Sequence, residues 1–166
     1  GVGGEGGVVG VCGEGEEVLS GVAGCVARDA GTDEGRLHVC TADLWDAAAA
    51  DGLVATAEDK AGAPLDILVN SAGLTRDTLA IRMKDEDWSR VMDVDLSAPF
   101  RLSRATLKGM LRRRSGRIVN IASVVGVTGH AGQVNYSAAK AGMSGMSKSM
   151  SQDAGARGVP ERERRV

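Results

Sequence analysis

The chain has 166 residues, of which 43% are hydrophobic and 25% charged, and its formal net charge is -2. This length is typical of one domain with a buried core, and the slight negative charge argues against nucleic acid as the main partner. No apolar run is as long as a membrane span and no secretory signal pattern begins the chain, so we expect a cytoplasmic protein without a membrane partner. The three cysteines lack the spacing of a metal site, so we expect no metal.

The first part of the chain alternates short apolar runs with helical patterns. Residues 1–7 are too rich in glycine for a regular element. We expect strands over 8–12 and 37–40, and helices over 16–29 and 46–61. Pro64 prevents the second helix from continuing.

The same alternation continues through the second part of the chain. We expect strands over 65–69 and 118–122, and helices over 85–114 and 134–157. Strands and helices that alternate in this way predict an α/β fold, with a doubly wound, Rossmann-like parallel sheet covered by helices on both faces.

Polar residues follow three of the expected strands. Asp43 comes after the strand over 37–40, Asn70 to Gly73 after the strand over 65–69, and Ser123 after the strand over 118–122. Because ligands of such folds bind outside the carboxyl ends of the strands, we expect these residues to lie along one rim of the sheet.

The only tyrosine of the chain, Tyr136, lies four residues before Lys140. This spacing places both side chains on one face of a helix. A phenol is a weak acid at neutral pH, and a neighbouring ammonium favours its ionised form. Tyr136 can then give a proton to a carbonyl oxygen, while Ser123 stabilises the charge that develops there. The alternative is that Tyr136 is a half-buried packing residue and Lys140 a solvated charge, because chance matches to so short a pattern are common.

Three motifs resemble the signature set of the short-chain dehydrogenase/reductase family. They are Asn70-Ser71-Ala72-Gly73, the lone Ser123, and Tyr136-Ser137-Ala138-Ala139-Lys140. The runs 73–77, 82–84 and 123–126 look like the 3-oxoacyl-[acyl-carrier-protein] reductase branch, and the stretch over 65–151 is similar throughout.

The resemblance implies hydride transfer from a nicotinamide cofactor to a 3-oxoacyl thioester linked to acyl-carrier protein, as in fatty acid synthesis. By this resemblance, Tyr136 is the general acid, Lys140 binds the nicotinamide ribose, and Ser123 polarises the ketone. The backbone of Asn70, Ala72 and Gly73 would line the cofactor, and Asp43 with Leu44 would contact its adenine. Arg114 and Arg157 fall where the family carries basic contacts to the carrier protein, although solvated surface arginines are common.

One catalytic position departs from the family. Where the family has an asparagine on its long helix, this chain has Asp95, which we include among the catalytic candidates. An ionised carboxylate only accepts hydrogen bonds, and its charge opposes the ionisation of Tyr136. Ser71 is a milder departure, because it replaces the second asparagine of the family motif.

Both ends of the chain also depart from the family. Gly1, Gly3 and Gly6 match a phosphate-loop pattern without a preceding strand, and the run over 8–12 fits the family's second strand instead. Residues 159–166 are dominated by Arg and Glu and argue against a central strand. We therefore expect a partial reductase domain over 1–158, without the first strand-helix unit and the last strands, and a charged, solvated tail over 159–166. A truncated or frame-shifted gene product would explain both ends.

Two choices stay open at this point. The branch favours NADP(H), whereas the glutamates at positions 14, 16 and 17 and the lack of a nearby arginine leave NAD(H) open. The chain is either a reductase that forms a homo-oligomer, such as a homotetramer, or a non-catalytic remnant that acts only through the oligomer interface of the family.

Overall fold

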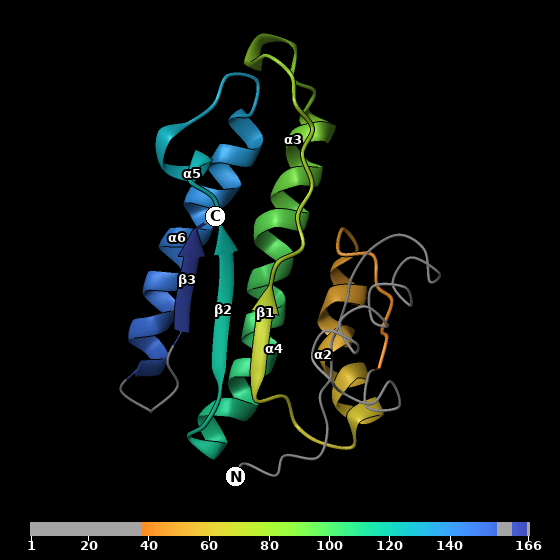
Figure 1. The fold of residues 1–166 in the computed structure, drawn as a ribbon. Coiled ribbons are helices and arrows are strands. Elements are labelled where there is room, and N and C mark those ends of the chain that lie inside the picture. Colours follow the sequence, from red (N-terminus) through yellow and green to blue (C-terminus); the bar gives the residue numbers. More distant parts are fainter. Residues whose placement is uncertain (1–37, 156–160, 166) are drawn as a thin grey trace, which may run out of the picture. The chain divides into compact units, whose positions relative to one another are not determined.

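The computed structural model describes residues 38–155 and 161–165, which belong to two compact units, Gly1–Leu65 and Asp66–Val166 (Figure 1). The strand expected over 8–12 and the helix expected over 16–29 lie outside the described residues, as do the glycines of the phosphate-loop pattern. The domain limits proposed from the sequence stay a prediction.

Helix α2, Ala47–Ala61, is the main described element of the first unit and confirms the helix expected there. The Asp46 side chain accepts a hydrogen bond from the Ala48 N–H at 2.9 Å and so caps the first turn. The helix ends at Gly62, whose φ of 63° is left-handed and suits a residue without a Cβ. The buried side of α2 consists of Ala50, Leu53, Val54 and Ala57.

The strand expected over 37–40 is wrong for its described residues, since His38–Cys40 form no regular element. A strand needs a hydrogen-bonded neighbour, and no ladder within the described ranges includes these residues. The Lys60 ammonium instead donates to the carbonyl oxygen of Val39 at 2.7 Å, which ties this segment to the end of α2.

A parallel sheet in the order β1-β2-β3 forms the centre of the second unit, which confirms the predicted α/β class (Figure 1). Strand β1, Ile67–Asn70, pairs with β2, Arg117–Ala122, so that Asn70 lies opposite Asn120. Helices α4, Ala98–Arg113, and α6, Val134–Gly155, contact these strands from one face. Met110, Ile118 and Ala154 form a buried cluster there, joined by Leu68, Leu107 and Leu111.

The charged tail expected over 159–166 is wrong for its described residues. Glu161–Arg165 form strand β3, which pairs in parallel with β2. Strand pairing is made by the backbone, and within the described sheet β3 has a partner on one side only. Charged residues are common on such edge strands, so the composition did not exclude one.

The long helix expected over 85–114 is divided into three segments. Helix α3, Asp85–Met92, is followed by the π-helical turn η3, Asp93–Ser97, and then by α4. Pro99 has no N–H to donate to the carbonyl of Asp95 four residues earlier, and the Ala98 N–H bonds to the carbonyl of Asp93 five residues earlier. Single π-turns of this kind are frequent at functional sites.

Two short elements were not predicted, the 3-10 helix η2, Ala80–Arg82, and helix α5, Val125–Thr128. Both are too short to show a hydrophobic period in the sequence. None of the helices in the described residues is long and apolar enough to cross a membrane.

Candidate active site

A cavity of about 560 Å³ opens beyond the carboxyl ends of β1 and β2 in the second unit. Its walls come from the segment after β1, from the end of β2 and from the first turns of α6. The lining residues are Ser71, Gly73, Leu74, Thr75, Ile121, Ala122, Ser123, Tyr136 and Lys140. The size is within the usual range for small-molecule sites, and the place is the one expected for a ligand of a parallel α/β sheet.

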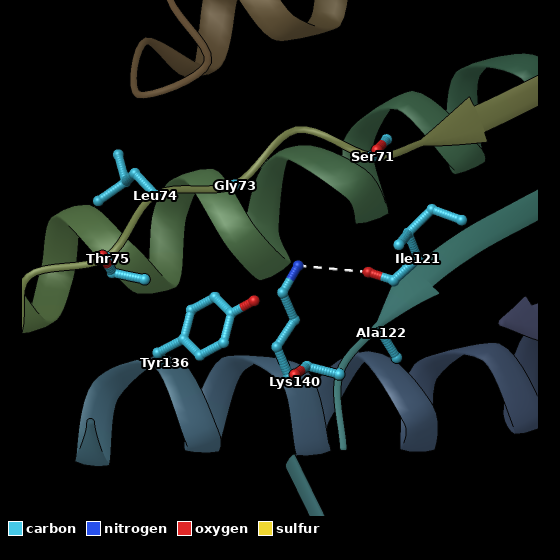
Figure 2. A pocket seen from close by; sticks show the side chains of 9 residues that line it. Ser71, Gly73, Leu74, Thr75, Ile121, Ala122, Tyr136 and Lys140 are labelled. Carbon is cyan, nitrogen blue, oxygen red and sulfur yellow. Dashed lines mark hydrogen bonds between the residues drawn. The ribbon is translucent and has the colours of Figure 1, made fainter. Parts of the chain in front are cut away.

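Tyr136 and Lys140 project from one face of α6 into this cavity, as their spacing predicts (Figure 2). The Tyr136 hydroxyl and the Lys140 ammonium both point toward the segment that contains Gly73 and Leu74. The ammonium nitrogen is 5.5 Å from the centroid of the Tyr136 ring. The phenol ring and the ammonium therefore lie side by side on the cavity wall.

Ser123 follows β2 directly and begins the turn that leads into α5. Its Oγ accepts a hydrogen bond from the Val125 N–H at 3.3 Å. This contact uses an acceptor site of the hydroxyl and leaves the hydroxyl proton for another acceptor.

Gly126 lets α5 approach α6 closely, because a Cβ there would be 2.8 Å from the backbone nitrogen of Ala141.

Lys140 is almost completely buried, with a side chain only 4% exposed. Its ammonium donates to the carbonyl oxygen of Ile121 at 3.3 Å and lies 3.6 Å from Oδ2 of Asp95. A buried charge needs such partners, because removing it from water is costly. The contacts fix the end of the Lys140 side chain at the inner wall of the cavity.

Asp95 lies in the π-turn η3 and is completely buried. Its Oδ1 accepts a hydrogen bond from the Leu74 N–H at 2.8 Å. Its Oδ2 makes an ion pair with Lys140 but no hydrogen bond within the described part of the chain, because 3.6 Å is too long for one. Burial raises the pKa of the Asp95 carboxyl above its usual value of 3.8, although the Leu74 N–H and the Lys140 charge act in the opposite direction.

The close approach of the segment after β1 depends on Gly73. A Cβ at this position would be 2.9 Å from Oδ2 of Asp95 and 3.4 Å from the Lys140 ammonium. Sequence reasoning placed Gly73 near the cofactor, and the structure adds that it covers the buried ion pair.

The remaining predicted site residues lie elsewhere. The Asn70 side chain is buried and bonded to Asn120 and Ser103, and neither Asn70 nor Ala72 lines the cavity. The exposed Asp43 accepts a hydrogen bond from the Trp45 N–H, and Leu44 is buried. Both are in the first unit, and their role toward a cofactor stays a prediction.

Of the two predicted carrier-protein contacts, only Arg114 is described, and it is not among the residues that line the cavity. Arg114 is exposed and precedes β2, at the end of that strand opposite Ser123. Arg157 lies outside the described residues. A contact of either with an acyl-carrier protein stays a prediction.

Asn135 is a further candidate that the sequence analysis did not single out. It is completely buried, its Nδ2 donates to the carbonyl of Arg76 at 3.1 Å, and its Oδ1 accepts from the Tyr136 N–H at 2.8 Å. It therefore joins the segment after β1 to the turn that carries Tyr136. Its position directly before Tyr136 is the only signal in the sequence that could have indicated this role.

Comparison with known proteins identifies the family. A sequence model of the short chain dehydrogenase family matches residues 3–160. The chain belongs to this family. Its members are oxidoreductases that use a nicotinamide cofactor, which agrees with the Ser123, Tyr136 and Lys140 arrangement in the cavity.

Several curated proteins are similar to the chain over part of their length. It is 57% identical over 95 residues to the 3-oxoacyl-[acyl-carrier-protein] reductase FabG of Vibrio cholerae, which covers 57% of this chain and 39% of the relative. It is 48% identical over 117 residues to the same reductase of Vibrio harveyi, which covers 70% and 48%. The reductase of Escherichia coli is 53% identical over 95 residues, with 57% and 39% covered. The chain thus spans less than half the length of these relatives.

The described residues fit the nicotinamide end of such a cofactor. The cavity brings a cation, a phenol and a hydroxyl together, and the absence of a side chain at Gly73 leaves the backbone accessible beside them. Lys140 can donate to sugar hydroxyls, and the backbone from Ser71 to Thr75 can border the ring. No group of three or more possible metal ligands occurs in the described ranges.

Proposed function

We propose that the chain reduces the ketone of a 3-oxoacyl thioester to the 3-hydroxyacyl form, with NADP(H) as the cofactor and acyl-carrier protein as the carrier of the substrate. The observation that carries this proposal is that Ser123, Tyr136 and Lys140, from two separate elements, line one cavity. The similarity to the 3-oxoacyl-[acyl-carrier-protein] reductases supports the choice of substrate. Fatty acid synthesis in the cytoplasm would be the setting.

Ser123, Tyr136 and Lys140 have different roles in the reduction of the ketone. A reduced nicotinamide supplies a hydride to the ketone carbon when it is bound. Ser123 donates a hydrogen bond to the ketone oxygen, which stabilises the negative charge that develops there. Tyr136 transfers its hydroxyl proton to the same oxygen, so that the product is an alcohol and the tyrosine is left as a phenolate. The Lys140 ammonium stabilises that phenolate through its positive charge.

Arg114 would contribute to carrier binding from a distance. One strand, β2, separates it from Ser123 along the chain, and six strand residues span roughly 20 Å. A carrier protein that touches Arg114 and delivers a substrate to the same cavity must bridge this span. Charge reversal at Arg114 is expected to raise KM for the carrier-linked substrate and to leave KM for a small thioester unchanged.

The test is the oxidation of NADPH by purified chain in the presence of an acetoacetyl thioester. We expect turnover with the unchanged chain, and a loss of about a hundredfold or more in kcat for Tyr136→Phe. Ser123→Ala should lose activity too, whereas Ser151→Ala, a serine of α6 outside the cavity lining, should retain it. The same assay with NADH in place of NADPH shows which of the two cofactors the chain uses.

Failure of this experiment has a defined meaning. If nicotinamide fluorescence shows neither NADPH nor NADH binding and no turnover occurs, the reductase proposal is wrong for this chain. The alternative, association through the oligomer surface without catalysis, would then be tested by measuring its mass in solution.

A further inference from the structure

The segment after β1 runs antiparallel to the start of α6 and approaches it at successive points. The residues that approach each other are Gly73 and Lys140, Arg76 and Asn135, and Thr78 and Gly132. The residue numbers rise along the segment while they fall along the facing chain. Thr75, between the first two of these points, therefore lies opposite Tyr136.

The dimensions of the two elements agree with this placement. At the rise of an extended chain, the two residues from Gly73 to Thr75 advance about 7 Å, and the four helical residues from Lys140 back to Tyr136 cover about 6 Å. Figure 2 shows Thr75 at the Tyr136 end of the cavity and Ser71 at the other end, where the segment leaves β1. Thr75 thus belongs to the part of the cavity where the phenol acts.

The backbone on both sides of Thr75 is fixed by buried side chains. The Leu74 N–H donates to Oδ1 of Asp95 at 2.8 Å, and the Arg76 carbonyl accepts from Nδ2 of Asn135 at 3.1 Å. Asp95 and Asn135 are both completely buried, whereas Thr75 itself is exposed. A ligand that binds the Thr75 side chain therefore finds a backbone that is already ordered, which lowers the entropy lost on binding.

The Thr75 hydroxyl is available to a ligand. Four hydroxyl groups line the cavity, those of Ser71, Thr75, Ser123 and Tyr136. The Thr75 hydroxyl makes no hydrogen bond to any other residue that the structure describes. Ser123 and Tyr136 both act on the ketone oxygen in the proposed reaction, so Thr75 is the hydroxyl that is left at their end of the cavity.

A 3-oxoacyl thioester carries two carbonyl groups separated by one methylene, and only the ketone is reduced. We propose that the Thr75 hydroxyl donates a hydrogen bond to the thioester carbonyl oxygen while Ser123 and Tyr136 bind the ketone oxygen. This inference rests on the proposed function and adds to it a residue that recognises the second carbonyl group.

Recognition of both oxygens has two consequences. It orients the ketone carbon more closely than one contact can, which favours a productive geometry for hydride transfer. It also gives the site a preference for 3-oxoacyl thioesters over simple ketones, because a ketone without the second carbonyl leaves the Thr75 hydroxyl unused.

The test compares two ketones that differ only at the second carbonyl. One is the acetoacetyl thioester of N-acetylcysteamine, and the other is its thioether, in which a methylene replaces the thioester carbonyl. Thr75→Val removes the hydroxyl and keeps the shape of the side chain. It should lower kcat/KM for the thioester by about 2- to 12-fold, as expected for one neutral hydrogen bond, and leave kcat/KM for the thioether unchanged.

Two further variants serve as controls for this comparison. Thr75→Ser retains a hydroxyl and should keep the preference for the thioester. Thr78→Val makes the same substitution in the same segment but outside the cavity lining, and it should change neither kcat/KM value. Equal losses on both ketones in Thr75→Val, or no loss on either, would overturn the role of Thr75.

A second measurement detects the hydrogen bond without turnover. The thioester is labelled with carbon-13 at its thioester carbonyl and bound in the presence of oxidised cofactor, which has no hydride to give. Because a hydrogen bond lowers the stretching frequency of a carbonyl group, the labelled infrared band should lie lower in the unchanged chain and in Thr75→Ser than in Thr75→Val. The same frequency in all three would contradict the contact.

The two measurements separate this inference from the reductase proposal. If the labelled thioester shows the shift that depends on Thr75 but is not reduced, the contact is correct and the proposed function is wrong. If the thioester is reduced and neither measurement responds to Thr75→Val, the proposed function stands and the inference is wrong. If the thioester neither binds nor reacts, both are wrong.

Discussion

Asn70 on β1 and Asn120 on β2 are paired across the sheet, with Nδ2 of Asn70 donating to Oδ1 of Asn120 at 2.7 Å. Asn70 also donates to Ser103 on α4 at 3.0 Å, and Asn120 donates to Ser147 on α6 at 2.8 Å. All four side chains are buried. The network thus connects β1 and β2 to α4 and α6 near the carboxyl ends of the strands, where the cavity opens.

Asn120→Ala should lower the free energy of unfolding by at least about 2 kcal/mol. The change leaves the Asn70 amide and the Ser147 hydroxyl buried without this partner, and unpaired buried polar groups are costly. Denaturant unfolding of Asn120→Ala, Ser147→Ala and the double variant measures the coupling. We expect a coupling of about 0.5 to 3 kcal/mol, and strictly additive effects would contradict a connected network.

Gly73→Ala should disturb the ion pair that Gly73 covers. The new methyl group would be 2.9 Å from the Asp95 carboxylate, which is buried and cannot move aside easily. We expect a loss of about 1–3 kcal/mol in stability, as for other overpacked sites, together with lower reductase activity. Gly145→Ala is the control: nothing lies within 4 Å of its Cβ position in α6, so it should stabilise the helix by roughly 0.5–1 kcal/mol.

Asp95 should give the stability of the chain a distinct dependence on pH. Its folded pKa is above the unfolded value, so the stability contributed by its neutral form is complete below the unfolded pKa and is lost as the pH rises through the folded pKa. Asp95→Asn cannot lose a proton. Its free energy of unfolding, minus that of the unchanged chain, should therefore increase as the pH rises from about 4 toward neutrality.

Denaturant unfolding at several pH values measures this difference. The same comparison with Asp93→Asn serves as the control, for which no comparable increase is expected. A difference for Asp95→Asn that stays constant with pH would show that burial does not raise the pKa of this carboxyl.

Asn135→Ala should slow catalysis more than it weakens substrate binding. Asn135 connects the Arg76 carbonyl to the backbone N–H of Tyr136, so its loss frees the turn that positions the phenol. Small misplacements of a catalytic group are costly, and we expect kcat to fall by about tenfold or more. Gln133→Ala is the matched control, because Gln133 also bridges to the facing segment, through Asp77 at 2.8 Å, but on the exposed surface. Similar losses in both variants would argue against a specific role for Asn135.

Local patterns predicted much of this fold correctly. Helix α2 lies within the range expected over 46–61, and the apolar run before Asn70 became β1. The four-residue spacing predicted that Tyr136 and Lys140 share one face of a helix, and the position of Ser123 after a predicted strand placed it at the rim where all three line one cavity. These features depend on neighbours along the chain, which a single sequence contains.

Features that depend on partners distant in sequence were not predicted. The pairing of Asn70 with Asn120 requires the register of β1 and β2, and the contact of Asp95 with Lys140 requires α6 to lie beside η3. The π-turn follows from Pro99 acting within an otherwise regular helix pattern. Strand β3 was not predicted because its residues are all charged, whereas its pairing with β2 is made by the backbone.

The central claim is that Tyr136 gives its proton to a ketone that receives hydride from a nicotinamide. Its most direct test uses NADPH with deuterium at the transferable position of the nicotinamide and an acetoacetyl thioester, with mass spectrometry of the 3-hydroxybutyryl product. We expect deuterium at the carbon that bears the new hydroxyl for the unchanged chain, and about a hundredfold less labelled product for Tyr136→Phe. Labelled product formed equally fast by Tyr136→Phe, or none formed by the unchanged chain, would contradict the account.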